Sequence, residues 1–317
     1  MRPVQMLRKG DTIGMIAPSG PCPNKRSIAK AAKAIEEMGL RVVTGKCCYE
    51  KRGYYAGCDD VRAEEINRFF GDPAIHGIFC MRGGDGAARL LHLLDLETIA
   101  ANPKVFLGYS DITALHIVLN QQARFITFHG PMPVTEFSEP GFEGFTRDCL
   151  MKAITQPAPL GEIIPPTNAP RIECISPGYA EGMLTGGNLS LICALMGTPF
   201  EIDTRGTILL IEDTDEPNYK IDRMLTQLRL AGKFTDAAGI AVGTFTNAEP
   251  ANPDKRYPVE EILRDILLPL KRPVLVNLPF GHGPLKATLP LGARAVLDAE
   301  QGRLVIVQSG VIAANAH

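Results

Sequence analysis

The sequence contains no tryptophan, and none of its apolar stretches approaches the length of a membrane-spanning helix, although 45% of its 317 residues are hydrophobic. A helix that crosses a bilayer needs about 20 consecutive apolar residues, so we expect no membrane insertion. The 33 basic residues nearly balance the 35 acidic residues, giving a net charge of −2. This near neutrality disfavours nucleic acid as a partner, because nucleic-acid binding usually requires a basic surface.

The eight cysteines include no C-x-x-C pair, and residues 1–10 are too short and too interrupted in hydrophobicity for a signal peptide. We therefore expect free thiols and a cytoplasmic location. No histidine pair has metal-ligand spacing, and the acidic run after residue 212 does not fit an EF-hand. The sequence thus predicts neither a metal nor a cofactor.

The first half of the chain alternates apolar runs with helical periodicity, which predicts four successive strand–helix units in a domain at residues 1–154. The expected strands are 12–17, 40–44, 77–81 and 105–107. Such units form a parallel sheet with helices on both faces, the α/β class. Six prolines between residues 155 and 177 predict a linker.

The remaining residues, 178–310, predict a second, smaller α/β domain. Its expected strands are 207–212, 239–245 and 273–277, with a closing hairpin at 295–297 and 304–307, and residues 184–196 are predicted to be a turn followed by a helix.

Ser110 follows an apolar run that stops at Gly108, and a helical pattern begins at Asp111. This spacing predicts a sharp strand-to-helix turn that holds the hydroxyl beside free backbone N–H groups, as in a nucleophile elbow. On this stretch alone, the more common role of such a serine, capping the helix that follows, is the favoured interpretation. The G-x-S-x-G pattern is not met, because Ile112 occupies the position of the last glycine.

The segment Arg82–Arg89 (RGGDGAAR) follows the third predicted strand and is rich in glycine. It fits neither nucleotide-binding consensus, so a phosphate loop is disfavoured. Because the segment has few side chains, its backbone N–H groups can face a ligand. They suit one side of an oxyanion hole, with the N–H of Asp111 on the other side.

Glu212 is the first acid after four apolar residues, and we expect it to be partly buried with a polar partner. We expect the acids that follow it, including Asp213, to form a solvated loop. His282 stands between two glycines after a strand, an arrangement typical of a side chain that reaches into a site. Ser110, Glu212 and His282 run in the order nucleophile, acid, base, which favours a serine hydrolase.

Several motifs also resemble the LD-carboxypeptidase family of serine peptidases, and they occur in the family order from about residue 7 to residue 307. They are RGGDGAARLL (82–91), GYSDITAL (108–115), LTGGNLS (184–190), the segment 212–228 and PFGHG (279–283). The resemblance implies a flavodoxin-like amino-terminal domain, a smaller β-rich carboxy-terminal domain with the site between them, and a homodimer. It also implies a peptidase of peptidoglycan recycling that releases the terminal D-Ala from a murein tetrapeptide.

The resemblance further implies a triad of Ser110, His282 and Glu212, with an oxyanion hole from the N–H groups of Gly84 and Asp111. A carboxypeptidase must bind a free carboxylate, for which Arg82 and Arg223 are candidates. The sequence differs from the expected family pattern at Asp85, where we expect an aromatic residue in many relatives. Because Asp85 lies next to the expected oxyanion hole, this difference is expected to affect substrate contacts there.

Three other interpretations stay open. An immunity-type relative would hydrolyse a peptidyl-nucleotide antibiotic and would carry an aromatic platform for the base; the absence of tryptophan disfavours this. A non-catalytic ligand-binding module would use Ser110 only as a helix cap. A nucleotide-binding regulator would rely on the glycine-rich segment.

Overall fold

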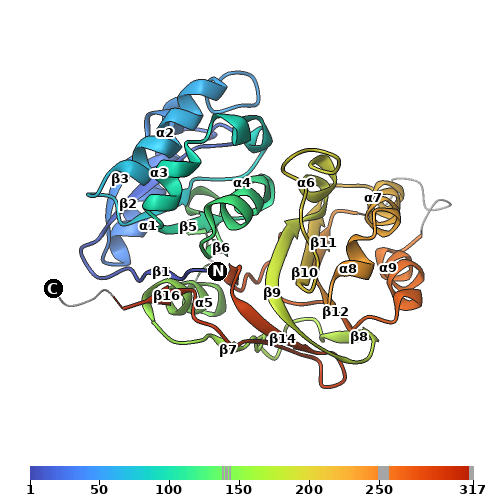
Figure 1. Cartoon of the computed structure of the whole chain (residues 1–317). Helices are drawn as coiled ribbons and strands as arrows, with labels where there is room; N and C mark the ends of the chain where they lie inside the picture. Colours follow the sequence, from blue (N-terminus) through green and yellow to red (C-terminus); the bar gives the residue numbers. More distant parts are fainter. Residues whose placement is uncertain (138, 140–141, 143, 249–256, 314–317) are drawn as a thin grey trace. The chain divides into compact units, whose positions relative to one another are not determined.

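The computed structural model describes residues 1–137, 139, 142, 144–248 and 257–313. The chain forms two compact units (Figure 1). The first contains residues 1–158, 288–292 and 309–317, and the second contains residues 159–287 and 293–308. The predicted linker segment includes two strands of the second unit, β7 (Gly161–Glu162) and β8 (Glu173–Ser176).

The first unit is built on a six-stranded sheet in the order β13-β6-β5-β4-β2-β3. Five strands are parallel, and β13 pairs antiparallel to β6. The parallel strands therefore follow the flavodoxin order 2-1-3-4-5. The strands are β2 (Thr12–Ile16), β3 (Arg41–Thr44), β4 (Gly77–Cys80), β5 (Val105–Gly108), β6 (Thr127–His129) and β13 (Leu289–Leu291). A separate parallel pair joins β1 (Val4–Gln5) to β16 (Val311–Ile312).

Helices of the first unit cover both faces of this sheet. The contacts divide them into two groups: α2 packs against α3, whereas α1 contacts the segment Pro133–Phe137. The helices are α1 (Lys25–Glu37), α2 (Asp59–Gly71), α3 (Leu96–Ala101), α4 (Thr113–Val118) and α5 (Phe145–Thr155). All residues of β4 and β5 are buried, as expected for central parallel strands with helices on both sides.

The second unit has an eight-stranded mixed sheet in the order β7-β15-β14-β9-β10-β11-β12-β8. Strands β9 to β12 are parallel, and the strands flanking them are antiparallel. The remaining strands are β9 (Tyr179–Asn188), β10 (Ile208–Thr214), β11 (Gly239–Thr246), β12 (Val274–Val276), β14 (Arg294–Asp298) and β15 (Arg303–Ile306). The helices are α6 (Leu189–Ala194), α7 (Asn218–Leu230), α8 (Lys233–Asp236) and α9 (Val259–Leu267).

The structure confirms the predicted α/β class, the parallel sheet of the first half and the closing hairpin of β14 and β15. One prediction was wrong: residues 184–188 are not a turn but the end of the long strand β9, which pairs with β10 over this whole stretch. Glycine is required at position 186 of the strand because neighbouring backbone approaches closely; a methyl group there would lie 2.1 Å from the carbonyl oxygen of Leu210.

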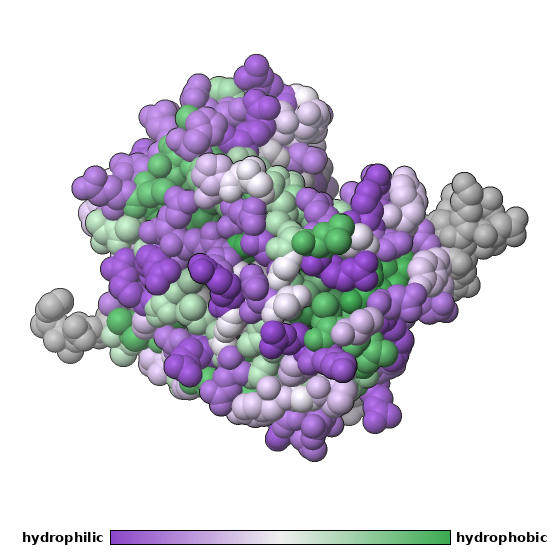
Figure 2. Space-filling model, turned by 45° about the vertical axis from the view of Figure 1, so that its right-hand side comes forward, coloured by the Kyte–Doolittle hydropathy of each residue, from purple (hydrophilic) through white to green (hydrophobic). Residues whose placement is uncertain are grey.

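Among the described residues, none of the helices combines the length and the apolar character that a bilayer span requires. On the face shown in Figure 2, hydrophilic side chains alternate with smaller hydrophobic areas.

Candidate active site

Ser110 lies in a strained turn at the carboxyl end of β5. Tyr109 is still extended, whereas Ser110 has φ +64° and begins a short 3-10 helix, Ser110–Ile112, that leads into α4. A side chain in this left-handed region costs about 1–2 kcal/mol, and such strain in a non-glycine residue is concentrated at functional sites. The predicted strand–turn–helix is confirmed, and Ser110 is half-buried.

The glycine-rich loop after β4 packs directly against this turn. A methyl group at Gly83 would lie 2.8 Å from Cβ and 2.9 Å from Oγ of Ser110, so only glycine fits there. The loop after β2 contacts the same backbone, since Gly20 N–H donates to the Gly83 carbonyl at 3.2 Å. A methyl group at Gly84 would in turn lie 2.9 Å from the Gly20 backbone. The structure therefore brings the predicted loop beside Ser110.

The Asp111 carboxylate joins these loops to the turn. Its Oδ2 accepts hydrogen bonds from Ser19 Oγ at 2.5 Å and from Ala87 N at 2.8 Å. Burial raises the pKa of Asp111 to about 6, although both hydrogen bonds act in the opposite direction. Asp111, whose backbone N–H is expected to bind an oxyanion, is thus held in place by the hydrogen bonds of its own side chain.

Arg62 is a buried residue that sequence reasoning missed. Its guanidinium donates to the carbonyl of Pro18 and, at 3.2 Å, to that of Gly86, and it forms an ion pair with Asp59 at 2.6 Å. It therefore links the loops after β2 and β4 from α2. The sequence did contain a signal of its burial: Arg62 lies four residues before Ile66, and residues at that spacing share one face of a helix, here the apolar face of α2.

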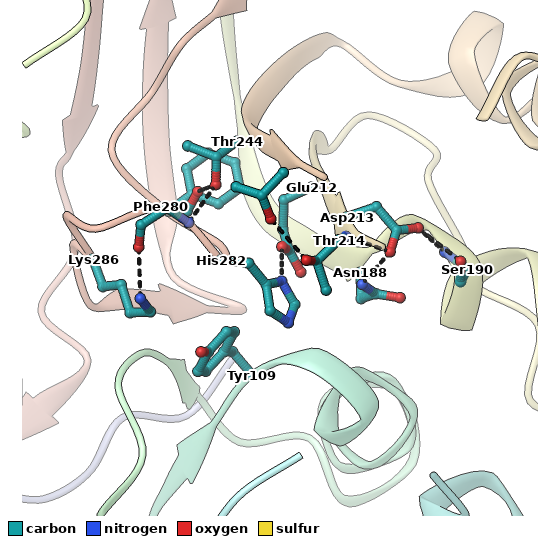
Figure 3. A network of polar contacts seen from close by, with 12 residues as sticks. Tyr109, Asn188, Ser190, Glu212, Asp213, Thr214, Thr244, Phe280, His282 and Lys286 are labelled. Atoms are coloured by element: carbon teal, nitrogen blue, oxygen red, sulfur yellow. Dashed lines mark hydrogen bonds and ion pairs between the residues drawn. The ribbon is translucent and has the colours of Figure 1, made fainter. Parts of the chain in front are cut away.

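The second unit places His282 on Glu212. Nδ1 of His282 lies 2.6 Å from Glu212 Oε2. Figure 3 marks this contact with a dashed line. Glu212 is fully buried in β10, and the His282 side chain is 15% exposed. Hydrogen bonding to a carboxylate fixes Nδ1 as the protonated nitrogen and leaves Nε2 as the basic one.

The His282 loop is held by close backbone contacts. Gly283 N–H donates to Thr244 Oγ1 at 2.8 Å, and Thr244 N–H donates to the Phe280 carbonyl at 3.0 Å. Lys286 Nζ donates to the Gly283 carbonyl at 2.6 Å (Figure 3). The contacts with Thr244 therefore attach the loop that carries His282 to β11.

The expectation that Asp213 lies in a solvated loop was wrong. Asp213 is 2% exposed and belongs to β10, which continues two residues past Glu212. It accepts hydrogen bonds from Asn188 Nδ2 at 2.8 Å and from the backbone N–H and hydroxyl of Ser190 at 2.9 and 2.7 Å. Burial raises the pKa of this carboxyl. Asp213 therefore secures the start of α6 against the strand that carries Glu212.

The charge state of His282 depends on two opposing effects. Burial lowers its pKa, but the hydrogen bond and negative charge of Glu212 raise it, and the net shift is upward from 6.5. The imidazolium form is therefore stabilised by its acidic partner, as a general base requires when it accepts a proton.

The candidate substrate contacts lie in different surroundings. Arg82 is half-buried and donates to the carbonyls of Pro21 and Gly83 at 3.1 and 3.2 Å. Asp85 is exposed within the glycine-rich loop, and Arg223 is exposed on α7 with its guanidinium 5.7 Å from the Tyr219 ring centroid.

In the described part of the chain, no group of three His, Cys, Asp or Glu side chains could hold a metal ion.

Gly281 makes the His282–Glu212 contact possible. Its φ is +95°, and a methyl group there would lie 2.6 Å from Glu212 Oε2. We expect Gly281→Ala to lower the free energy of unfolding by about 2–4 kcal/mol, through backbone strain and overpacking. It should also reduce the raised pKa of His282, because the carboxylate must move. Urea unfolding followed by circular dichroism and NMR titration of the imidazole measure the two effects.

Gly302→Ala is the matched control, because Gly302 also has a positive φ, +67°, but no neighbouring atom within 4 Å of the added methyl group. It should show only the backbone cost and an unchanged His282 titration. An unchanged titration in Gly281→Ala would contradict the close-contact argument.

A strained serine turn beside a glycine-rich loop, and a carboxylate-bound imidazole, are the parts of a serine hydrolase built on an α/β fold. Models of the LD-carboxypeptidase N-terminal and C-terminal domains match residues 13–130 and 181–297. The chain belongs to the LD-carboxypeptidase family, and it is a serine-type carboxypeptidase. The family resemblance noted in the sequence is confirmed.

Individual relatives agree over nearly the full length. The chain is 40% identical over 307 residues to the probable murein peptide carboxypeptidase of Bacillus subtilis, covering 96% of this chain and 94% of that relative. The crystal structure of muramoyltetrapeptide carboxypeptidase from Oxalobacter formigenes matches with a TM-score of 0.81 at 29% identity, covering 96% of this chain and 100% of that chain.

The microcin C7 self-immunity protein MccF of Escherichia coli is a second kind of relative. Its structure in complex with aspartyl sulfamoyl adenosine matches with a TM-score of 0.89 at 28% identity, covering 98% of this chain and 100% of that chain. The two kinds of relative therefore share this fold.

Proposed function

We propose that this enzyme hydrolyses the L,D-peptide bond that releases the terminal D-Ala from a murein tetrapeptide. The observation that carries the proposal is the 2.6 Å hydrogen bond between His282 and Glu212, in a chain that also holds Ser110 in a strained turn. The sequence relatives named for murein peptides support the substrate class.

In the proposed mechanism, Ser110 Oγ attacks the carbonyl carbon of the penultimate residue while His282 Nε2 accepts the hydroxyl proton. The N–H groups of Gly84 and Asp111 stabilise the negative charge on the carbonyl oxygen. Glu212 stabilises the imidazolium, which then donates its proton to the leaving D-alanine nitrogen. This step breaks the peptide bond and leaves an acyl-enzyme.

Water then attacks the ester, with His282 again accepting a proton, and the serine hydroxyl is restored. Arg82 and Arg223 are the proposed cationic contacts for the substrate carboxylate, and exposed Asp85 is proposed to contact the substrate beside the oxyanion hole. The mechanism needs no metal or cofactor.

Incubation of the protein with a panel of murein tetrapeptides, followed by mass spectrometry, tests the proposal. We expect a product that lacks one alanine residue when the terminal residue is D-Ala, and no product from the L-Ala epimer. A fluorophosphonate probe should label Ser110, because a serine that only caps a helix is not activated. Intact tetrapeptides after prolonged incubation would exclude the proposed substrate.

A second candidate activity, hydrolysis of a peptidyl nucleotide, is favoured by the close structural match to MccF. The absence of tryptophan counts against it, because a nucleobase usually needs an aromatic platform. Incubation of the enzyme with aspartyl sulfamoyl adenosine, followed by the same mass spectrometry, distinguishes the two activities: release of aspartate supports the second.

The pH dependence of kcat/KM should follow the neutral form of His282. Because its pKa is raised, the fraction of neutral imidazole increases with pH through a midpoint above 6.5, and activity should increase with it. A pH–rate profile with saturating and limiting tetrapeptide measures this midpoint. An acidic limb centred well below 6.5 would contradict the role of His282 as the base.

A homodimer in the cytoplasm is also part of the proposal, and its support is the family resemblance. Light scattering coupled to size-exclusion chromatography tests the oligomeric state.

A further inference from the structure

Two adjacent tyrosines, Tyr54 exposed and Tyr55 half-buried, form an aromatic pair between β3 and α2. The ring centroids of Tyr54 and Tyr55 are 4.3 Å apart at an interplanar angle of 56°, and their hydroxyls are 3.2 Å apart. Tyr54 is 63% exposed. The proposed mechanism does not use these residues.

The pair is attached to the loops that border Ser110. A methyl group at Gly86 would lie 2.6 Å from ring atoms of Tyr55, so the ring rests on the glycine-rich loop. The guanidinium groups of Arg62 and Arg89 lie 5.1 and 5.3 Å from the centroid of the Tyr55 ring. The next residue, Ala56, donates its N–H to the carbonyl of Ser19 at 2.9 Å. Tyr55 is therefore fixed, and Tyr54 is presented to solvent.

The distance to the nucleophile is limited by the chain. Gly86 is three residues from Gly83, which contacts Ser110, and three residues span at most about 10–11 Å. The Tyr55 ring thus lies within roughly 20 Å of Ser110, at the carboxyl edge of the same sheet. In a sheet of this strand order, ligands bind at that edge, near the point where the order reverses between β2 and β4.

The rings of the pair, and not the charged groups beside them, determine which ligand fits. Arg62 and Arg89 share the single carboxylate of Asp59, at 2.6 Å each, and are already engaged in ion pairs. An exposed tyrosine ring offers a flat face with a hydroxyl at its edge, which suits the apolar C–H face and the hydroxyls of a pyranose.

We propose that Tyr54 and Tyr55 form a saccharide subsite that stacks on the sugar of a muropeptide substrate. This inference rests on the proposed function and extends it to the amino end of the substrate. Release of one residue from a tetrapeptide leaves three residues between the scissile bond and the sugar, and three extended residues span about 10 Å. That reach falls within the limit that the chain sets for the distance between Ser110 and the Tyr55 ring.

The test compares two substrates, the free tetrapeptide and the same peptide carrying its N-acetylated muramyl sugar. We expect Tyr54→Ala to lower kcat/KM for the sugar-bearing substrate about fivefold to tenfold, through KM, which corresponds to about 1–1.4 kcal/mol. Hydrolysis of the free peptide should change less than twofold. Tyr54→Phe should retain most of the sugar preference, because it keeps the ring.

Tyr179→Ala is the matched control, since Tyr179 is 61% exposed at the start of β9 in the second unit. It should leave both substrates unaffected. Equal losses on both substrates in Tyr54→Ala, or no loss on the sugar-bearing one, would overturn the saccharide subsite.

Calorimetric binding of both compounds to the Ser110→Ala protein separates the two proposals. If the Ser110→Ala protein shows sugar-dependent binding that requires Tyr54, but the wild-type enzyme hydrolyses neither compound, the proposed function is overturned and the subsite is supported. Normal hydrolysis with affinities independent of Tyr54 overturns the subsite alone. Binding of aspartyl sulfamoyl adenosine that requires Tyr54, with no sugar preference, would assign the pair to a nucleobase and also overturn the proposal.

Discussion

Replacing Ser110 with alanine should lower tetrapeptide turnover by at least about 10⁴-fold while leaving the fold intact. The hydroxyl is the proposed nucleophile, and without it only binding and oxyanion stabilisation remain to assist water. Alanine and serine have similar tolerance of the positive φ at this turn, so stability should change little. Mass spectrometry of the products measures turnover, and circular dichroism measures folding.

Ser27→Ala, in helix α1, provides a comparison in which a serine is lost away from the turn. It should retain wild-type turnover. Turnover of the Ser110→Ala protein within tenfold of wild type would remove Ser110 from the mechanism, whatever the family resemblance implies.

Replacing Glu212 with glutamine should lower kcat by about 10³–10⁴-fold. The amide preserves size but supplies no charge to stabilise the imidazolium, and its NH₂ group can donate to Nδ1 and so select the wrong tautomer. Burial of His282 would then act without the opposing carboxylate. The acidic limb of the pH–rate profile should therefore shift to lower pH, a change that mere loosening of the loop would not produce.

Asp203→Asn removes an acid of the same unit that forms an exposed ion pair with Arg205. It should leave both kcat and the pH profile unchanged. A Glu212→Gln protein with an unshifted acidic limb would show that Glu212 does not control the pKa of His282.

The parts of the fold that could be predicted from the sequence are those determined by local pattern. Apolar runs such as Val105–Leu107 mark central strands, because strands buried on both faces lack polar alternation. The same logic located Ser110, Glu212 and His282, since each polar residue comes after an apolar run in the sequence. Their combination in one mechanism is a proposal that sequence order and family resemblance suggested together.

The features that could not be predicted depend on contacts between distant segments. Asp213 is buried because Asn188 and Ser190 provide hydrogen bonds, and nothing in the acidic run itself reveals those partners. Arg62 is buried because carbonyl oxygens of two loops converge on it. Hydropathy alone scores both side chains as exposed, because it cannot account for compensating hydrogen bonds. For Arg62, only its place on the apolar face of α2 signalled burial.

The chain returns to the first unit after it has built most of the second. Strand β13 comes from residues 289–291, yet it covers the edge of β6, and β16 pairs with β1 near the start of the chain. In a fragment that stops at residue 158, β6 would therefore become an exposed edge strand with unpaired backbone groups, and such an edge promotes self-association. The unit that carries Ser110 is consequently not an autonomous module that truncation can isolate, and gene fusions or domain exchanges must keep residues 289–291 and 311–312.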